Sequence, residues 1–156
     1  MKAITILQPW ASLIACGAKQ IETRSWPTKY RGPLAIHAGK KNPHDMMVSL
    51  PHNTSKSIYD CLCTKWGIRS GALNKMTTGA VIALVDLVDC VLMDALNYSI
   101  GGKVNGVWLV NGDFVEGNEL AFGDYSQGRY AWILENVRPI DPVPARGMQR
   151  LWEWEG

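Results

Sequence analysis

The amino-acid sequence has 156 residues, the length of one folding domain, and its composition of 47% hydrophobic and 19% charged residues excludes a disordered chain. The formal net charge of +2 combines two opposite parts: residues 1–41 carry seven basic side chains and one acidic, and residues 86–124 carry seven acidic and one basic. This division either focuses an anionic ligand on one face or, if the two parts pair across the fold, leaves an ordinary solvated surface.

The first 41 residues predict one short helix among three strands. Pro9 is compatible with the first turn of a helix, and Gly17 stands where helices commonly end in left-handed backbone. The loop over residues 26–32 interleaves aromatic and basic side chains. In chain order we expect a strand over residues 4–7, a helix over residues 10–16, and strands over residues 19–25 and 33–39.

The rest of the chain predicts a helical insert followed by more strands. Asn42-Pro43 is suited to cap a helix at the start of an insert over residues 42–78, and residues 55–66 have helical spacing. Residues 99–128 hold seven of the fifteen glycines and predict a long loop or an irregular hairpin. Strands are expected over residues 79–93 and 129–137 and, after three prolines that require an edge or a bulge, at the C-terminus.

This order of elements predicts the α+β class. A parallel doubly wound sheet requires regular alternation of strands and helices, which the chain lacks. We therefore expect one domain over residues 1–156 that forms a small, mostly antiparallel β-barrel with two to four flanking helices.

The segment from Gly17 to Arg24 has the most unusual composition. Strict alternation places Glu22 and Arg24 on one side of a strand, where they are expected to form an ion pair, with Arg24 free to bind phosphate or carboxylate. Lys19 follows the turn at Gly17, which is able to redirect its side chain, and a desolvated lysine is suited to act as a base or nucleophile. The alternative is the solvated polar face of an edge strand.

Several other side chains are candidates for ligand binding. Gln8 and Trp10 lie one helix before this segment, and an amide beside an aromatic ring is suited to bind a base. Trp26 and Arg31 belong to the aromatic and basic loop, a combination found on single-strand nucleic-acid surfaces. His37 is a candidate proton carrier or hydrogen-bonding group. Trp10 is equally compatible with a core position, and His37 with a structural one.

Other classes of site are not supported by the sequence. Residues 101–106 lack the spacing of a phosphate-binding loop, and neither a nucleophile elbow nor a dinucleotide-binding motif is present. Cys61 and Cys63 are separated by one residue, whereas the cysteine pairs of zinc sites are commonly separated by two, and four scattered cysteines do not form a disulfide framework. We expect no metal and no cofactor. The N-terminus lacks the apolar core of a signal peptide, so a cytoplasmic protein without membrane contact is expected.

The pattern Gly17-x-Lys19-x-x-Glu22-x-Arg24 resembles the signature of the ASCH domain family, named for activating signal cointegrator homology, within the PUA-like superfamily. The flanking sequences resemble the same family in order. They include Gln8-Pro9-Trp10-Ala11 before the signature and residues 26–34, 36–40, 79–82, 122–125, 128–132 and 146–152 after it. The likeness covers nearly the whole chain except residues 42–78 and 99–120.

The resemblance implies a PUA-like β-barrel with a cleft between the first helix and the barrel, and binding of RNA, a nucleotide or a modified nucleoside. Some members of the family are enzymes, including one branch that deacetylates an acetylated cytidine nucleoside and uses a lysine, a threonine and a later glutamate. Lys19 matches that lysine, whereas Glu22 stands at the threonine position. We therefore expect a binding module with a basic cleft. The alternatives are a metal-independent hydrolase with Lys19 as base and Glu22 as its partner, and a protein-interaction domain built on residues 99–128.

Overall fold

The computed structural model describes residues 1–93, 96–100 and 103–156, with side chains described over residues 1–93 and 106–156. Asp94, Gly101 and Gly102, which entered the charge and loop arguments above, lie outside the described residues. The described elements are β1 (Lys2–Ile6), α1 (Trp10–Ala15), β2 (Ile21–Arg24), β3 (Gly32–Ala38), α2 (Pro43–Ser49), α3 (His52–Trp66), α4 (Ala72–Lys75), β4 (Ala80–Leu92), β5 (Leu96–Ile100), β6 (Lys103–Trp108), β7 (Phe114–Glu116), α5 (Gly117–Ala121), β8 (Tyr130–Pro144) and β9 (Leu151–Glu153).

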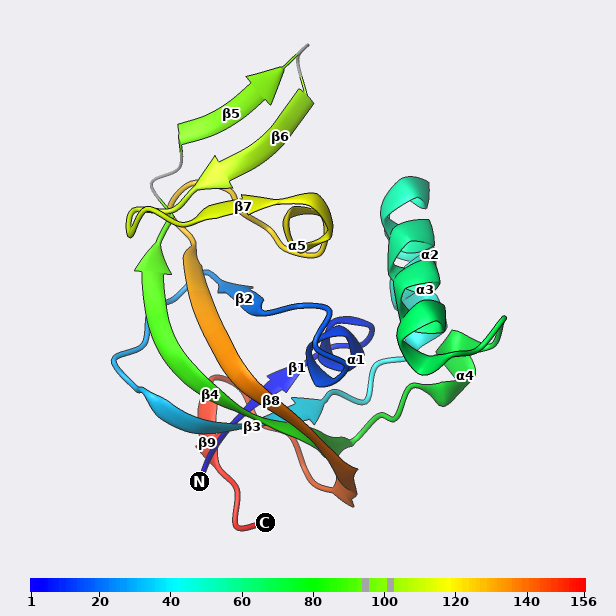
Figure 1. Cartoon of the computed structure of the whole chain (residues 1–156). Coiled ribbons are helices and arrows are strands. Elements are labelled where there is room, and N and C mark those ends of the chain that lie inside the picture. Colours follow the sequence, from blue (N-terminus) through cyan, green and yellow to red (C-terminus); the bar gives the residue numbers. More distant parts are fainter. Residues whose placement is uncertain (94–95, 101–102) are drawn as a thin grey trace.

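The main sheet has six strands in the order β2-β8-β4-β3-β1-β9 and curls into a half-barrel (Figure 1). Every neighbouring pair is antiparallel except β1 and β3. The long strands β4 and β8 pair through several register shifts, and bulges of this kind increase the local twist of a sheet. The predicted α+β class and mostly antiparallel, barrel-like architecture are confirmed.

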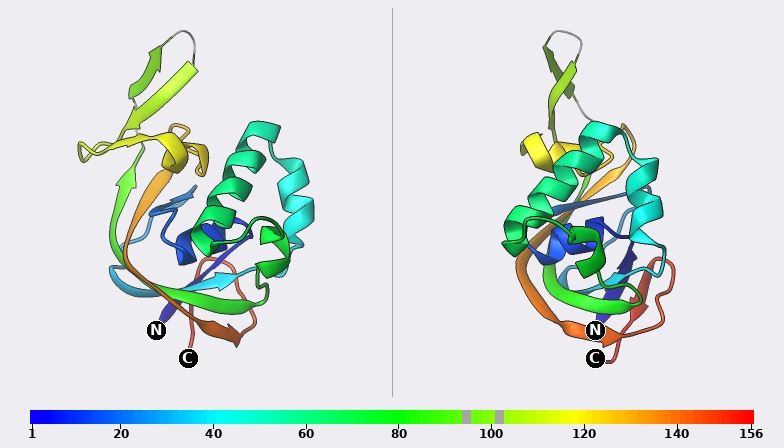
Figure 2. Two further views of the ribbon diagram at one scale, coloured as in Figure 1. Left: turned by 45° about the vertical axis from the view of Figure 1, so that its right-hand side comes forward. Right: turned by 90° about the vertical axis from the view of Figure 1, so that its right-hand side faces the viewer.

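The helices lie on the concave side of this sheet (Figures 1 and 2). Ala11 and Ile14 of α1 face the sheet core, whereas Leu13 packs into a second cluster with Ile58 and Leu62 of α3. The described residues form five helices, one more than the expected maximum of four. The difference comes from α4 and α5, which are single turns of four and five residues and too short to be predicted from periodicity. Among the described residues, none of the helices combines the length and apolar character needed to cross a membrane.

Helix boundaries follow the predicted capping signals. Gly17 has a φ of 72°, and the amides of Ala18 and Lys19 both donate to the carbonyl of Leu13, so the chain turns sharply after α1. The side chain of Asn42 accepts a hydrogen bond from the amide of His44 at 2.9 Å and caps α2, as predicted. The turn after Gly17 places Lys19 immediately before β2.

The prolines of β8 occupy an edge of the sheet, as predicted. β2 pairs only with Tyr130–Ile133, so the second half of β8 has a single neighbour, β4. Pro139 lies opposite Ala83 beside a register shift. Proline is tolerated here because an edge position does not require its missing amide hydrogen.

Residues 99–128 are more regular than the long loop that the glycines predicted. Strands β5, β6 and β7 form a separate antiparallel sheet that projects from the half-barrel (Figure 1), and α5 follows directly. The hairpin alternative is thus confirmed for β5 and β6, whereas β7 and α5 were not predicted. Leu109 and Val115 anchor this region to the main body through a cluster with Val91 and Tyr125.

Candidate functional site

A cleft of about 410 Å³ lies between the end of β1, the start of α1, β2 and the segment that joins α5 to β8. We name it the main cleft. Its volume is within the range of small-molecule sites, about 300–1,000 Å³. Its lining residues are Thr5, Ile6, Leu7, Trp10, Glu22, Thr23, Arg24, Leu50, Thr54, Ala121, Phe122, Gly123, Asp124 and Arg129.

Lys19 is buried directly behind one wall of this cleft, with 1% of its surface exposed. Its Nζ donates a hydrogen bond to the carbonyl of Ile21 and lies 3.9 Å from a carboxylate oxygen of each of Glu22 and Glu119. Burial lowers the pKa of Lys19, because desolvation outweighs the opposing attraction of the two carboxylates. The turn at Gly17 does redirect the lysine, which reaches Glu22 although strict alternation would separate them.

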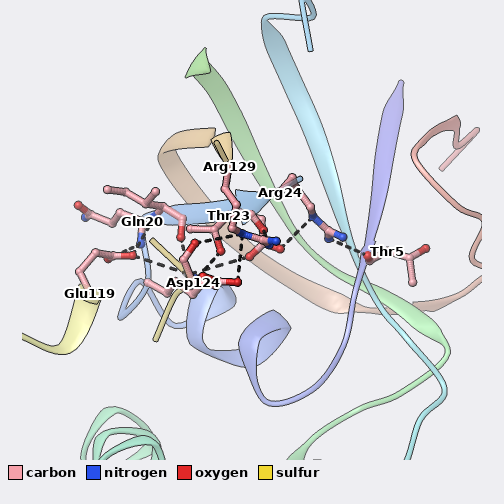
Figure 3. Close-up of polar contacts among 10 residues, drawn as sticks. Thr5, Gln20, Thr23, Arg24, Glu119, Asp124 and Arg129 are labelled. Atoms are coloured by element: carbon pink, nitrogen blue, oxygen red, sulfur yellow. Dashed lines mark hydrogen bonds and ion pairs between the residues drawn. The ribbon is translucent and has the colours of Figure 1, made fainter. Parts of the chain in front are cut away.

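Glu119 connects α5 to the beginning of β2. Its two carboxylate oxygens accept hydrogen bonds from the amides of Gln20 at 2.8 Å and Ile21 at 3.0 Å, as Figure 3 shows for the labelled Glu119 and Gln20. A carboxylate that accepts two backbone N–H groups is held rigidly, and bonds to a charged acceptor are stronger than neutral ones. Sequence reasoning missed Glu119, which lies in a five-residue helix without a motif.

Glu22 and Arg24 form the ion pair that the sequence predicted. Arg24 Nε lies 3.0 Å from Glu22 Oε1, and Arg24 Nη2 donates to the carbonyl of Thr5 at 3.0 Å (Figure 3). Both charged side chains line the main cleft. Glu22 thus connects the buried Lys19 with Arg24, because its two oxygens face different cations.

A second arginine of the lining, Arg129, lies beside Thr23 of β2 and is held in the same manner. Arg129 lies 3.3 Å from Asp124 Oδ2 and donates to the carbonyl of Thr23 at 3.3 Å, while the hydroxyl of Thr23 accepts from the amide of Asp124 at 3.1 Å (Figure 3). The hydrogen bond from the Ser126 hydroxyl, more than the charge of Arg129, lowers the pKa of Asp124. Neither Asp124 nor Arg129 was a predicted site residue.

Tyr125 adds a buried phenol close to the two carboxylates behind the wall. It is 7% exposed, and its hydroxyl oxygen has no hydrogen-bond partner that meets geometric criteria among the described residues. Burial raises its pKa, and the nearby charges of Glu119 and Glu22 raise it further. The phenol therefore stays neutral, with its hydroxyl group near the carboxylate of Glu119.

The charges that line the main cleft are balanced and not predominantly basic. Arg24 and Arg129 are each paired with a carboxylate of the same lining, Glu22 and Asp124. Lys19 also contacts Glu119, which comes from the acidic part of the chain. At Lys19 and Glu119 the basic and acidic parts of the chain therefore pair across the fold, which is the second of the two interpretations of the charge division given above.

The structure brings together some of the predicted site residues and separates others. Trp10, Glu22 and Arg24 line the main cleft, Lys19 lies behind it, and Trp26 lies in a neighbouring groove. The other three candidates, Gln8, Arg31 and His37, lie outside the lining.

The contacts of these three residues explain their positions. The buried amide of Gln8 donates to the carbonyl of Thr77 at 2.7 Å and accepts from the amide of Ser12 at 3.0 Å, so both of its ends hold the backbone. Arg31 forms an exposed ion pair with Asp89 at 2.9 Å. His37 Nε2 lies 3.1 Å from the carbonyl of Ala145. Each of the three side chains thus has a partner within the fold, and their assignment to ligand binding stays a prediction.

The described residues contain no group of three or more His, Cys, Asp and Glu side chains arranged to hold a metal ion. The polar groups that face the main cleft are instead two guanidinium groups, two carboxylates and threonine side chains. This set is suited to hydrogen bonding and ion pairing with a polar ligand, and Trp10 adds an aromatic surface.

Two comparisons with known proteins find related sequences. The family model described as the ASCH domain matches residues 4–144. Activating signal cointegrator 1 of Homo sapiens is 36% identical over 87 residues, which are 56% of this chain and 14% of that protein, and its counterpart from Mus musculus gives the same values. The aligned region thus spans a small part of both relatives.

Proposed function

Because the chain belongs to the ASCH domain family, whose members are generally RNA-binding, we propose that it binds RNA or a nucleotide in the main cleft. In this proposal residues 1–156 are one ASCH domain, with residues 42–78 as a helical insert and residues 99–128 as a glycine-rich segment. The observation that carries the proposal is the placement of Arg24, Arg129 and Trp10 around one cleft of nucleotide-compatible size.

Each lining group has a counterpart in a nucleotide. Guanidinium groups bind phosphate oxygens through paired N–H donors, and Arg24 and Arg129 are already oriented by bonds to backbone carbonyls. The half-buried Trp10 offers a ring surface for a base. Glu22 offers carboxylate oxygens to the amino group of a base, as acidic side chains do toward cytosine.

Binding of short RNAs and nucleotides to Arg24→Gln tests this proposal, with Arg31→Gln as the matched control. Each arginine is paired with one carboxylate, at 3.0 Å and 2.9 Å, but Arg31 lies outside the cleft. We expect Arg24→Gln to weaken binding by at least about tenfold, because a charge-assisted contact to phosphate contributes about 1.5–3 kcal/mol. We also expect binding to weaken with salt, because phosphate contacts release counterions.

Absence of RNA and nucleotide binding, or equal losses in Arg24→Gln and Arg31→Gln, would remove the main cleft as the site. Circular dichroism and thermal unfolding of both variants establish that they remain folded, so a loss of affinity is assigned to the contact itself.

A second candidate function, hydrolysis of a nucleoside amide or an RNA phosphodiester, is favoured by the position of the buried Lys19 3.9 Å from Glu22, a carboxylate of the cleft lining, together with the lowered pKa of Lys19. A lysine that releases its proton more readily serves as a base, and Glu22 is placed between Lys19 and the cleft to accept that proton or orient the amine. In this scheme water supplies the attacking oxygen, and the leaving amine or alcohol takes up a proton.

Mass spectrometry of acetylated nucleosides and short RNAs after incubation with the protein tests this activity. We expect a product with wild type and at least a hundredfold slower turnover with Glu22→Gln, since general acid–base groups contribute about 10²–10⁴-fold. Turnover that persists in Glu22→Gln would remove the assignment. Binding without any product would leave the binding proposal alone.

A further inference from the structure

A second groove of about 360 Å³ adjoins the main cleft on the other side of Arg24. Thr5 and Arg24 line both the cleft and this groove, so a ligand that leaves the cleft past Arg24 enters the groove directly. The groove is otherwise formed by Ile4, by Trp26 and by residues 148–150 before β9. Its lining thus includes one tryptophan and two arginines, Arg24 and Arg150.

The ring of Trp26 is held in a fixed orientation. It packs edge-on against the fully buried Trp132, with ring centroids 4.7 Å apart and an interplanar angle of 85°. The guanidinium of Arg150 lies 5.8 Å from the centroid of the Trp26 ring. A preoriented ring with an arginine beside it has the components of a stacking platform for a nucleic-acid base.

The two arginines retain hydrogen-bonding capacity for a ligand. Arg150 is exposed and forms no ion pair with any described side chain. Among the described residues the Arg24 side chain forms one hydrogen bond, from Nη2 to the carbonyl of Thr5, whereas Nε lies 3.0 Å from Glu22 in an ion pair without a hydrogen bond. Arg24 lies at the junction of the two sites, where a strand that crosses from one to the other would carry a phosphate.

We propose that the main cleft and the Trp26 groove together bind two consecutive nucleotides of single-stranded RNA, with Arg24 on the phosphate between them. This inference rests on the proposed function, and it names an oligonucleotide and not a free nucleotide as the ligand. The first base occupies the main cleft, and the next base stacks on Trp26. Arg150 moves from the ring to the following phosphate, or remains against the stacked base.

The test compares the affinities of RNA homotetranucleotides with those of the corresponding 5′-mononucleotides, for all four bases, by calorimetry over the same series of salt concentrations. We expect the best tetranucleotide to bind at least tenfold tighter than its mononucleotide, because stacking on an aromatic side chain and one more phosphate contact both add affinity. Trp26→Leu, which keeps apolar bulk against Trp132, is expected to lower tetranucleotide affinity about tenfold and to leave mononucleotide affinity unchanged.

A second variant tests the arginine in the groove. Arg150 has a φ of 59°, and asparagine tolerates this left-handed conformation, so Arg150→Asn removes the guanidinium without adding backbone strain. The matched control is Arg146→Asn, an exposed arginine of the same segment outside the groove. We expect only Arg150→Asn to weaken tetranucleotide binding and to reduce its salt dependence.

The possible failures are distinguishable. Equal affinity for mononucleotide and tetranucleotide would overturn the two-nucleotide path and leave the proposed function intact. Tighter tetranucleotide binding that Trp26→Leu and Arg150→Asn do not weaken would place the second nucleotide elsewhere and overturn the Trp26 groove. Absence of binding to both ligands would overturn the proposed function and this inference together.

Discussion

Lys19 and His37 are both 1% exposed, but their neighbours differ in kind. Lys19 faces the carboxylates of Glu22 and Glu119, and these reach it from β2 and α5. His37 faces the carbonyl of Ala145 and the edge of the Trp152 ring, with ring centroids 5.7 Å apart. Two carboxylates, one local and one from a distant segment, thus converge on Lys19, whereas a backbone carbonyl and an aromatic ring contact His37.

This difference distinguishes Lys19, a candidate functional residue, from His37, a packed one. Burial lowers the pKa of both side chains, so a lowered pKa does not by itself distinguish them. What distinguishes Lys19 is that one of its charged partners, Glu22, lines the main cleft and is 3.0 Å from a second cation of that cleft. His37 has no comparable link among the described residues. A buried ionisable group is a better functional candidate when its partners reach a ligand-sized space.

The largest expected effect is the loss of stability in Glu119→Ala. The substitution leaves the amides of Gln20 and Ile21 without their acceptor and removes one carboxylate from Lys19. We expect a loss of about 3 kcal/mol in the free energy of unfolding, measured by urea denaturation, because hydrogen bonds to a charged acceptor contribute about 1.5–3 kcal/mol each and Glu119 is only partly buried.

Glu116→Ala is the matched control for this substitution. Glu116 is exposed, precedes α5 and forms no side-chain cap bond. We expect its removal to change stability by less than about 0.5 kcal/mol, as is usual for surface positions. Equal losses in the two variants would show that Glu119 does not hold α5 against β2, and the contrast between Lys19 and His37 would lose its basis.

Gly147→Ala probes the packed side of the comparison. A Cβ at this position would lie 2.4 Å from Cε1 of His37 and 2.7 Å from Oγ1 of Thr5, far inside contact distance. We expect a destabilisation of about 1–3 kcal/mol, the usual cost of overpacking, measured by urea denaturation. Gly17→Ala is unsuitable as a control because its φ of 72° adds backbone strain.

A double-mutant cycle identifies the cause of that loss. If the methyl group clashes with the imidazole, Gly147→Ala costs less in a His37→Ala background than in wild type, because the ring is no longer present. Additive effects would instead show that the glycine is required for the course of the backbone and not for the approach of the imidazole.

Much of the fold was predictable because its signals are local. Pro9 and Gly17 bracket α1, Asn42 caps α2, and the apolar run after Gly79 forms β4. The Glu22–Arg24 pair was also predictable, since residues two apart on a strand share a face. The later strands and α5 were harder, because β7 has three residues and α5 has five, too few for periodicity.

The site was only partly predictable, for reasons of distance. Glu119 binds amides that lie 99 and 98 positions away in the chain, and no local pattern encodes such a contact. The charge division did indicate that acidic and basic parts would meet, but not which side chains. For Gln8 the local signal pointed to a ligand contact, because an amide is suited to recognise a base. In the fold both ends of this amide form hydrogen bonds to the backbone.

The smallest expected effect is the pH dependence of stability that His37 contributes. Burial, more than the charge of Lys40, lowers the pKa of His37 below its ordinary value of 6.5, while the bond to Ala145 opposes the change. The unfolded chain therefore binds the proton more readily, so the stabilisation is fully present above pH 6.5 and is lost as the pH falls toward the folded-state pKa.

His37→Gln isolates this contribution because an amide nitrogen is able to replace Nε2 as the donor to Ala145. Between pH 7.5 and pH 5.5 we expect wild type to lose more unfolding free energy than His37→Gln, by at most about 1.4 kcal/mol, the limit for one group over the single pH unit below 6.5. Equal losses in the two proteins would mean that His37 is protonated as easily in the fold as in water. His37 would then have to be solvated or paired with an acidic group, and its separation from the ligand-facing chemistry of Lys19 would no longer hold.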